Sequence, residues 1–279
     1  MLAEALLYAL ARLGGQQNPH GHLTELVGIW ARHRRQRRAW AEHLTRARVL
    51  CLKAAEACAA RRTALVLGAG LLLDVPLEQL SALFRRVVLA DLAFLPATSR
   101  LAKSLDNVEL IVTDLSGCLD ALPDAGALEA RTPAPRPDLT LSLEELDFVY
   151  SANLLTQLPL YAVSGLAKRD PAPDESDVEA FAASLVRAHL EALRSMPCPA
   201  CLVTDSLERG YRDGQLEYEA DLLYGVDLDM PGETWPWLMA PRGEAEPGLD
   251  VERLVFGAPD ARGARSPHSS AQPLGGLHV

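Results

Sequence analysis

Residues 64–70 read ALVLGAG, and three similar stretches follow: VVLAD at 87–91, VELIVTDLSG at 108–117 and DFVYSANLLTQLP at 147–159. Each begins with a short apolar run of the kind that forms a strand covered on both faces of a sheet. Each run then ends at glycine, aspartate or asparagine. Because helical segments separate the runs, the alternation predicts an α/β fold with a parallel sheet.

The same patterns, followed along the whole chain, place the other elements. We expect strands at 63–67, 86–90, 108–113, 146–151, 200–204, 216–228 and 251–256. We expect helices at 2–13, 23–61, 77–84, 96–105 and 177–195. The last two strands are expected to be antiparallel. The chain is therefore expected to be an N-terminal helical region (1–62), an α/β domain (63–257) and a disordered tail (258–279).

Composition limits the class of protein. The chain has 279 residues, of which 49% are hydrophobic and 23% charged, so it has the composition of a globular protein. Its net charge of −10 argues against a general nucleic-acid binder. No apolar run is long enough for a membrane span, and the five cysteines form no disulfide pattern. A cytoplasmic protein is the simplest expectation.

The residues at the strand ends predict a ligand site. In an open parallel sheet, ligands bind beyond the carboxyl ends of the strands. Gly68 and Gly70 would let the backbone approach a ligand closely. Asp91, after the second strand, is placed to accept hydrogen bonds from ribose hydroxyls, and Asp114, after the third, could reach an adenine amino group.

In their order, these four stretches resemble the class I S-adenosylmethionine-dependent methyltransferases over roughly residues 60–205. The resemblance implies a Rossmann-like, doubly wound, mostly parallel sheet of seven strands, with S-adenosylmethionine as cofactor. It assigns cofactor binding to Gly68, Ala69, Gly70, Asp91, Leu92, Asp114, Leu115 and Asn153. It also implies that the segment SANLLTQLP faces the methyl group and the acceptor, with Asn153 and Gln157 as its polar members.

The first turn departs from the family pattern. Leu72 stands where a third glycine is usual, and Leu67 stands beside the place of a common acid. A non-catalytic protein on the same fold, acting as a binding or scaffolding partner, is therefore a second hypothesis. A dinucleotide oxidoreductase is less favoured, because its G-x-G-x-x-G motif is incomplete here. Asp74 and Pro76 are expected to cap the next helix.

The methyl acceptor is expected to be a small molecule, though the sequence does not identify it. The chain lacks the Asn-Pro-Pro-aromatic motif of amino-methylating nucleic-acid enzymes. Trp235 and Trp237 could line an acceptor pocket or pack in the core. The seven arginines of 30–48 leave an RNA methyltransferase open, although pairing with the acidic remainder of the chain is the preferred interpretation.

The remaining polar motifs have structural interpretations. Cys198 and Cys201 form a lone C-x-x-C that leads into a strand, without further ligands for zinc. No metal is expected. Asp205 is expected to be a turn or cap residue at the end of the fifth strand. The histidines of the N-terminal region, His20, His22, His33 and His43, are expected to be ordinary polar residues, unless the helices there form a lid over the acceptor.

Overall fold

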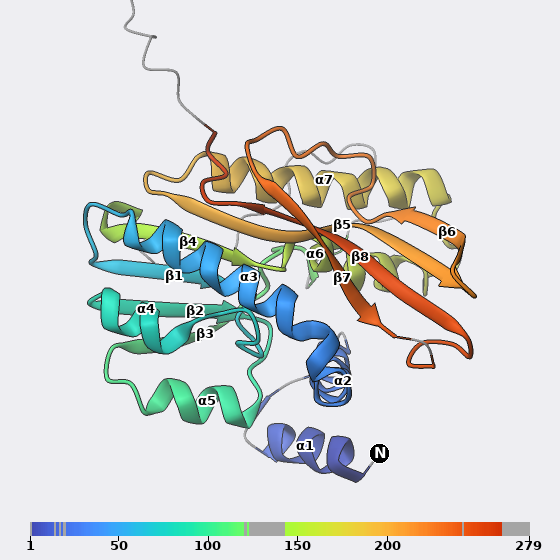
Figure 1. The fold of residues 1–279 in the computed structure, drawn as a ribbon, viewed down its shortest axis with the longest axis horizontal. Helices are drawn as coiled ribbons and strands as arrows, with labels where there is room; N and C mark the ends of the chain where they lie inside the picture. The colour runs from blue at the N-terminus through green and yellow to red at the C-terminus, as the bar shows by residue number, and fades with distance from the viewer. Residues whose placement is uncertain are drawn as a thin grey trace, which may run out of the picture.

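The computed structural model of the chain contains one sheet of eight strands with helices on both faces (Figure 1). It describes residues 2–13, 15, 16, 18, 21–119, 122, 143–241 and 243–263, without the side chains of residues 2 and 143. Seven strands form a continuous path in the order β3-β2-β1-β4-β5-β8-β7, and β6 pairs with β5 beside that path. The predicted fold class, a doubly wound and mostly parallel sheet, is confirmed.

The first five strands are parallel, and the last three are antiparallel. The strands are β1 (Thr63–Leu67), β2 (Arg86–Asp91), β3 (Val108–Val112), β4 (Leu146–Ala152), β5 (Ala200–Arg212), β6 (Gln215–Asp221), β7 (Glu233–Ala240) and β8 (Leu249–Ala258). Leu67 is paired with Ala90 on one side and with Ser151 on the other. The residues that follow these three therefore meet at one edge of the sheet.

Helices precede the sheet and connect its parallel strands. They are α1 (Leu2–Leu13), α2 (His22–Arg35), α3 (Arg37–Glu56), α4 (Leu77–Leu83), α5 (Pro96–Lys103), α6 (Leu158–Leu166) and α7 (Glu175–Arg194). Two short 3₁₀ helices are η3 (Leu143–Glu145) and η4 (Leu155–Gln157). Within the described residues, no helix is both long enough and apolar enough to cross a membrane.

The alternation of side chains along β1 explains the two helical layers. Ala64 and Val66 pack in one buried cluster with residues of α3 and α4. Leu65 and Leu67 pack in a second cluster with residues of α7. Successive side chains of a strand point to opposite faces, so an entirely apolar strand needs a cover on each face.

The N-terminal helical region differs from its prediction in a break and in its end, since α3 stops at Glu56 rather than at 61. The single helix expected over 23–61 is two helices, interrupted at Gln36, whose backbone leaves the helical region at φ −108° and ψ 25°. The side chain of Gln36 donates a hydrogen bond to Glu244, 2.9 Å away, in the segment after β7. The sequence around Gln36 has no glycine or proline that would have indicated this break.

α3 shares its core with the sheet. Its buried apolar side chains belong to the same cluster as the inner side chains of β1, β7 and β8; they are Trp40, Leu44, Ala47, Leu50, Cys51, Ala54 and Ala55. The indole of Trp40 donates a hydrogen bond of 2.9 Å to the carbonyl of Met239 in β7. The predicted boundary at residue 62 therefore does not separate two hydrophobic cores.

The antiparallel part of the sheet differs most from the sequence prediction. β5 extends eight residues beyond its expected end at Thr204, because β8 pairs with it from Leu202 to Arg212. β7, with its two tryptophans, was not predicted as a strand. The expected start of the tail, residue 258, is the last residue of β8, and residues 264–279 lie outside the described residues.

Candidate active site

Two adjoining clefts lie at the carboxyl edge of the parallel strands. The β3-side cleft has an empty volume of about 560 Å³, counting space open to solvent, and Asp91, Asp114 and Tyr161 are among its lining residues. The β7-side cleft has about 510 Å³ on the same measure, and its lining includes Gly68, Asp74 and Trp237. Both clefts share Leu26, Ile29, Asp91 and Gln157. α2, which supplies Leu26 and Ile29, thus borders both clefts.

The turn after β1 requires its two glycines. Gly68 has a φ of 83°, and a Cβ built on it would lie 2.7 Å from the carbonyl oxygen of Ala152 at the end of β4. A Cβ on Gly70 would lie 2.9 Å from the carbonyl oxygen of Ala93 and 3.0 Å from a carboxylate oxygen of Asp91. The backbone of the turn is therefore in direct contact with the ends of β2 and β4.

Asp91 is held at the junction of the two clefts by backbone amides. The N–H of Gly70 donates to Oδ2 at 2.7 Å, and that of Leu92 donates to Oδ1 at 2.6 Å. Burial raises the pKa of this carboxyl to about 6, although the backbone hydrogen bonds oppose the shift. The backbone of Ala93 provides a third hydrogen bond to this carboxyl. Since a carboxylate offers about four acceptor positions, one is left for a ligand.

Asp114 shapes the loop that follows β3. Its Oδ1 accepts hydrogen bonds from the backbone and hydroxyl of Ser116, at 2.8 and 2.6 Å, and its Oδ2 accepts one of 2.8 Å from the N–H of Leu119. These are the contacts of a turn residue. Asp114 and Leu115 nevertheless both line the β3-side cleft. Contact of this loop with an adenine ring stays a prediction.

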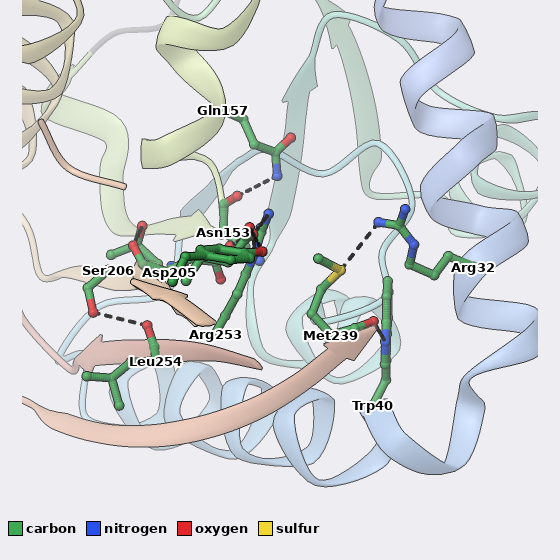
Figure 2. A network of polar contacts seen from close by, with 12 residues as sticks. Arg32, Trp40, Asn153, Gln157, Asp205, Ser206, Met239, Arg253 and Leu254 are labelled. Carbon is green, nitrogen blue, oxygen red and sulfur yellow. Dashed lines mark hydrogen bonds and ion pairs between the residues drawn. The ribbon is translucent and has the colours of Figure 1, made fainter. Parts of the chain in front are cut away.

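Asn153 connects the end of β4 to its neighbours on both sides. It takes the left-handed conformation, with φ 49°, which asparagine adopts more readily than most residues. Its carbonyl accepts a hydrogen bond of 2.6 Å from the side chain of Gln157, and its Oδ1 accepts one of 3.2 Å from the N–H of Asp205 (Figure 2). The segment from Asn153 to Gln157 is thus fixed where it lines the β7-side cleft.

Asp205 is not the turn or cap residue that the sequence suggested. The strand continues past it, and its carboxylate is 1% exposed and paired with Arg253 of β8 (Figure 2). Arg253 also donates to Glu208 at 3.0 Å. Burial raises the pKa of Asp205, and the charge of Arg253 opposes that shift. The ion pair fixes Asp205, and the N–H of Asp205 in turn holds the side chain of Asn153.

Asp74 lies in the β7-side cleft rather than at a helix cap. α4 begins after Pro76 and has no side-chain capping bond, so the predicted role is wrong. Burial raises the pKa of the Asp74 carboxyl to about 6, and the nearby charge of Arg48 opposes the shift. Leu72, which replaces the family's third glycine, has a φ of 56° and lines the same cleft. The turn therefore keeps a backbone shape that suits glycine.

Aromatic rings from α3 and β7 are part of the lining of this cleft, namely those of Trp40, His43 and Trp237. His43 stacks on Trp237 with ring centroids 4.2 Å apart and planes 12° apart. Trp40 meets Trp237 edge-on at 4.8 Å. The indole N–H of Trp235 donates to Nδ1 of His43 at 3.2 Å, and burial lowers the pKa of His43 to about 4. His43 is therefore neutral near pH 7, with its ring proton on Nε2.

Most of the site residues that the sequence analysis predicted line one or both of the clefts. Nine of them line one cleft or both: Gly68, Gly70, Asp91, Leu92, Asp114, Leu115, Asn153, Gln157 and Trp237. Ala69 and Trp235 are instead buried in the core, 0% and 1% exposed, and line neither of these clefts.

Sequence reasoning missed three residues of the β7-side cleft as site residues: Trp40, His43 and Asp74. Trp40 and His43 are three residues apart on one helix, so they share a face, and this spacing could have paired them. His22 also lines a cleft, on the β3 side, and His20 lies outside the described residues.

The other motifs keep their structural interpretation. Cys198 and Cys201 are buried free cysteines, and no group of three or more potential metal ligands occurs within the described part of the chain. Three of the seven arginines in 30–48 pair with carboxylates: Arg32 and Arg35 with Glu244, and Arg46 with Glu42. The partner of Arg32 and Arg35, Glu244, belongs to the acidic remainder of the chain, as the preferred interpretation of the sequence predicts.

No protein-family model matches the chain, and no curated protein matches it. Similar solved structures include a DhpI–SAH complex, with 19% identity over 86% of this chain and 96% of that one, at a TM-score of 0.34. Another is the Burkholderia thailandensis 1,6-didemethyltoxoflavin-N1-methyltransferase with bound 1,6-didemethyltoxoflavin and S-adenosylhomocysteine. It has 12% identity over 86% of this chain and 90% of that one, at a TM-score of 0.33. At such low values the likeness carries no functional conclusion.

Proposed function

We propose that the protein is an S-adenosylmethionine-dependent methyltransferase that acts on a small molecule. The observation that carries the proposal is the position of Asp91. Its carboxylate is fixed by the amide of Gly70 and lies where the two clefts meet, at the carboxyl edge of the strands. The adenosine of the cofactor would lie in the β3-side cleft, and its methionine part would reach the glycine turn where the clefts meet. The rest of the β7-side cleft would hold the acceptor.

The residues of the strand ends fit this cofactor. The turn at Gly68 and Gly70 brings backbone close to the ligand, as the methionine part of the cofactor would need. Asp91 has acceptor capacity for a ribose hydroxyl, and Leu115 offers an apolar surface beside Asp114 for a base. When bound, S-adenosylmethionine supplies a sulfonium methyl group, which passes to a nucleophilic atom while the carbon–sulfur electron pair returns to sulfur.

Two observations favour a catalytic protein with a small acceptor over the alternatives. The left-handed backbone at Leu72 keeps the shape of the glycine turn, which argues against a turn that has lost its ligand. Arg32 and Arg35 are held by Glu244, so they do not form an open basic surface for RNA. Methyl transfer depends mainly on positioning, so a cleft that orients two ligands suffices.

Calorimetric titration with S-adenosylmethionine and S-adenosylhomocysteine tests the proposal. We expect micromolar affinity, about −8 kcal/mol, for the wild-type protein. Asp91→Asn keeps the shape of the side chain but removes its charge. It should weaken binding at least tenfold, because a charge-assisted hydrogen bond contributes about 1.5–3 kcal/mol. Asp106→Asn, at an exposed position between α5 and β3, is the matched control and should bind as the wild type does.

A folded protein that binds neither compound would overturn the proposal and favour the non-catalytic alternative. Unchanged affinity in Asp91→Asn would overturn the ribose assignment alone. RNA binding that falls steeply with salt concentration would favour the RNA methyltransferase.

A further inference from the structure

The β7-side cleft holds a buried hydrogen-bond donor that the described chain does not satisfy. Trp237 is 6% exposed and lines this cleft, and its indole N–H has no hydrogen-bond partner among the described residues. Its two neighbours differ, since Trp40 donates to the carbonyl of Met239 and Trp235 donates to His43. Buried donors in folded proteins are nearly always paired, so the exception indicates a partner supplied from the cleft.

We propose that this cleft binds a planar aromatic acceptor that carries a carbonyl or ring-nitrogen hydrogen-bond acceptor for Trp237, and a hydroxyl or N–H group whose proton passes to Asp74. The proposal rests on the proposed function, which it extends to the substrate class. It concerns the acceptor's binding, however, so it can be tested without the cofactor.

The planar shape follows from the walls. The nearly parallel rings of His43 and Trp237 line the cleft together with Leu71 and Leu72. Apolar and aromatic walls with a few convergent polar groups are typical of sites for small aromatic ligands. A charged or strongly hydrated acceptor would lose its water against these walls without compensation.

Asp74 is the group best placed to take a proton in this cleft. Both oxygens of Asp91 already hold backbone amides. His43 accepts from Trp235 at Nδ1, so its other nitrogen is a donor. The carboxylate of Asp74 is hydrogen-bonded by the backbone of its own residue, which lowers its pKa less than burial raises it. The charged and titratable groups near it are Arg48 and Cys51 of α3, Tyr150 of β4, Asp91 of β2 and Asp205 of β5.

The proton balance of the step is simple. The O–H or N–H bond of the acceptor breaks, and its electron pair stays on that atom. The proton passes to a carboxylate oxygen of Asp74. The electron pair left on the acceptor atom, or another lone pair of that atom, forms the bond to the methyl carbon. The carbon–sulfur electron pair returns to sulfur, as above. A carboxyl whose pKa burial raises to about 6 is a better base near neutral pH than an ordinary aspartate.

Binding of two phenols tests the part of the proposal that concerns Trp237. Umbelliferone is a planar phenol with a lactone carbonyl, whereas β-naphthol is a planar phenol without one. Each is titrated into the full-length protein, with and without S-adenosylhomocysteine, and binding is followed by fluorescence. We expect Trp237→Phe to weaken umbelliferone binding about tenfold, the value of one hydrogen bond, and to leave β-naphthol binding unchanged.

Trp30→Phe is the matched control, because Trp30 of α2 lines neither cleft. It should bind umbelliferone as the wild type does. Equal weakening by both substitutions would show a structural effect and overturn the role of Trp237. Thermal unfolding of each variant shows that it is folded.

Asp74→Asn tests the part that concerns the proton. A carboxylate beside the bound phenol disfavours its ionisation, so removing that charge should let bound umbelliferone ionise at lower pH, as its absorbance spectrum reports. An unchanged ionisation would overturn the role of Asp74.

The experiments can overturn the aromatic acceptor site and the methyltransferase function independently. If S-adenosylhomocysteine binds and neither phenol does, the aromatic acceptor is overturned while the methyltransferase stands. If umbelliferone binds through Trp237 and the cofactor does not bind, the methyltransferase is overturned and the aromatic site stands.

Discussion

Gly68 has both a left-handed backbone and a close contact with β4, and a comparison with Gly214 separates the costs of the two. It has a φ of 83°, and a Cβ there would lie 2.7 Å from the carbonyl oxygen of Ala152. Gly214, in the turn between β5 and β6, has a nearly equal φ of 80° with nothing within 4 Å of the same position. Gly214→Ala should therefore cost only the left-handed conformation, about 1 kcal/mol.

Gly68→Ala should cost clearly more in urea unfolding and should also weaken binding of S-adenosylhomocysteine, because the turn must move away from β4. Equal losses in the two variants would contradict a close-contact role for Gly68.

At the residue scale, the sequence predicted the strand-end residues well. Gly68, Asp91 and Asn153 each follow a recognisable strand, so their positions at one edge come directly from the parallel topology. Asp74 and His43 could not be predicted in this way. Their places in the cleft depend on how α3 and β7 pack against the turn, which involves contacts between distant parts of the chain.

At the scale of elements, the regular pattern of the parallel strands made them predictable, and the antiparallel strands were harder. Pro236 stands in the middle of β7, and a proline usually argues against a central strand. β7 is the edge strand of the sheet, where a missing N–H is tolerated. Its buried side chains, Trp235, Trp237 and Met239, nevertheless alternate with exposed ones, as in any half-buried strand.

The pair of Asp205 and Arg253 joins two such elements, β5 and β8. Arg253→Met should destabilise the protein by about 3 kcal/mol, because it leaves the buried carboxylate of Asp205 without its partner. Adding Asp205→Asn should restore part of this loss by removing the charge. Arg209→Met on β5, which breaks the exposed pair with Glu219 of β6, is the control and should change little.

Urea unfolding of the four proteins measures these effects. A loss in Arg253→Met that the second substitution does not reduce would contradict the assignment of the cost to an unpaired charge.

At the scale of the whole molecule, burial of histidines and burial of aspartates have opposite effects on how stability depends on pH. Burial lowers the pKa of His43 and of His189 to about 4, and raises the pKa of Asp74 and of Asp91 to about 6. Between these values the unfolded chain binds more protons at the histidines, so their contribution to stability rises with pH. The folded chain binds more protons at the two aspartates, so their contribution falls with pH. The four groups should largely cancel between about pH 4 and pH 6.

Asp74→Asn removes one of the two aspartates whose contribution to stability falls with pH. Below about pH 4 the carboxyl is protonated in both states, so the variant and the wild type should be almost equally stable. As pH rises from about 4 to 6, the unfolded wild type releases this proton more readily than the folded protein, so the wild type alone loses stability. The variant should then become more stable by about 2–3 kcal/mol, the equivalent of a pKa raised from 3.8 to about 6.

The free energy of unfolding of both proteins, measured from pH 4 to pH 8, checks this expectation, with the exposed Asp106→Asn as control. A difference that does not grow with pH would show that the Asp74 carboxylate is not destabilised by burial. A growing difference would mean that the fold keeps a charged group in the cleft at a cost to its own stability. That is the situation expected where the carboxylate serves the ligand rather than the fold.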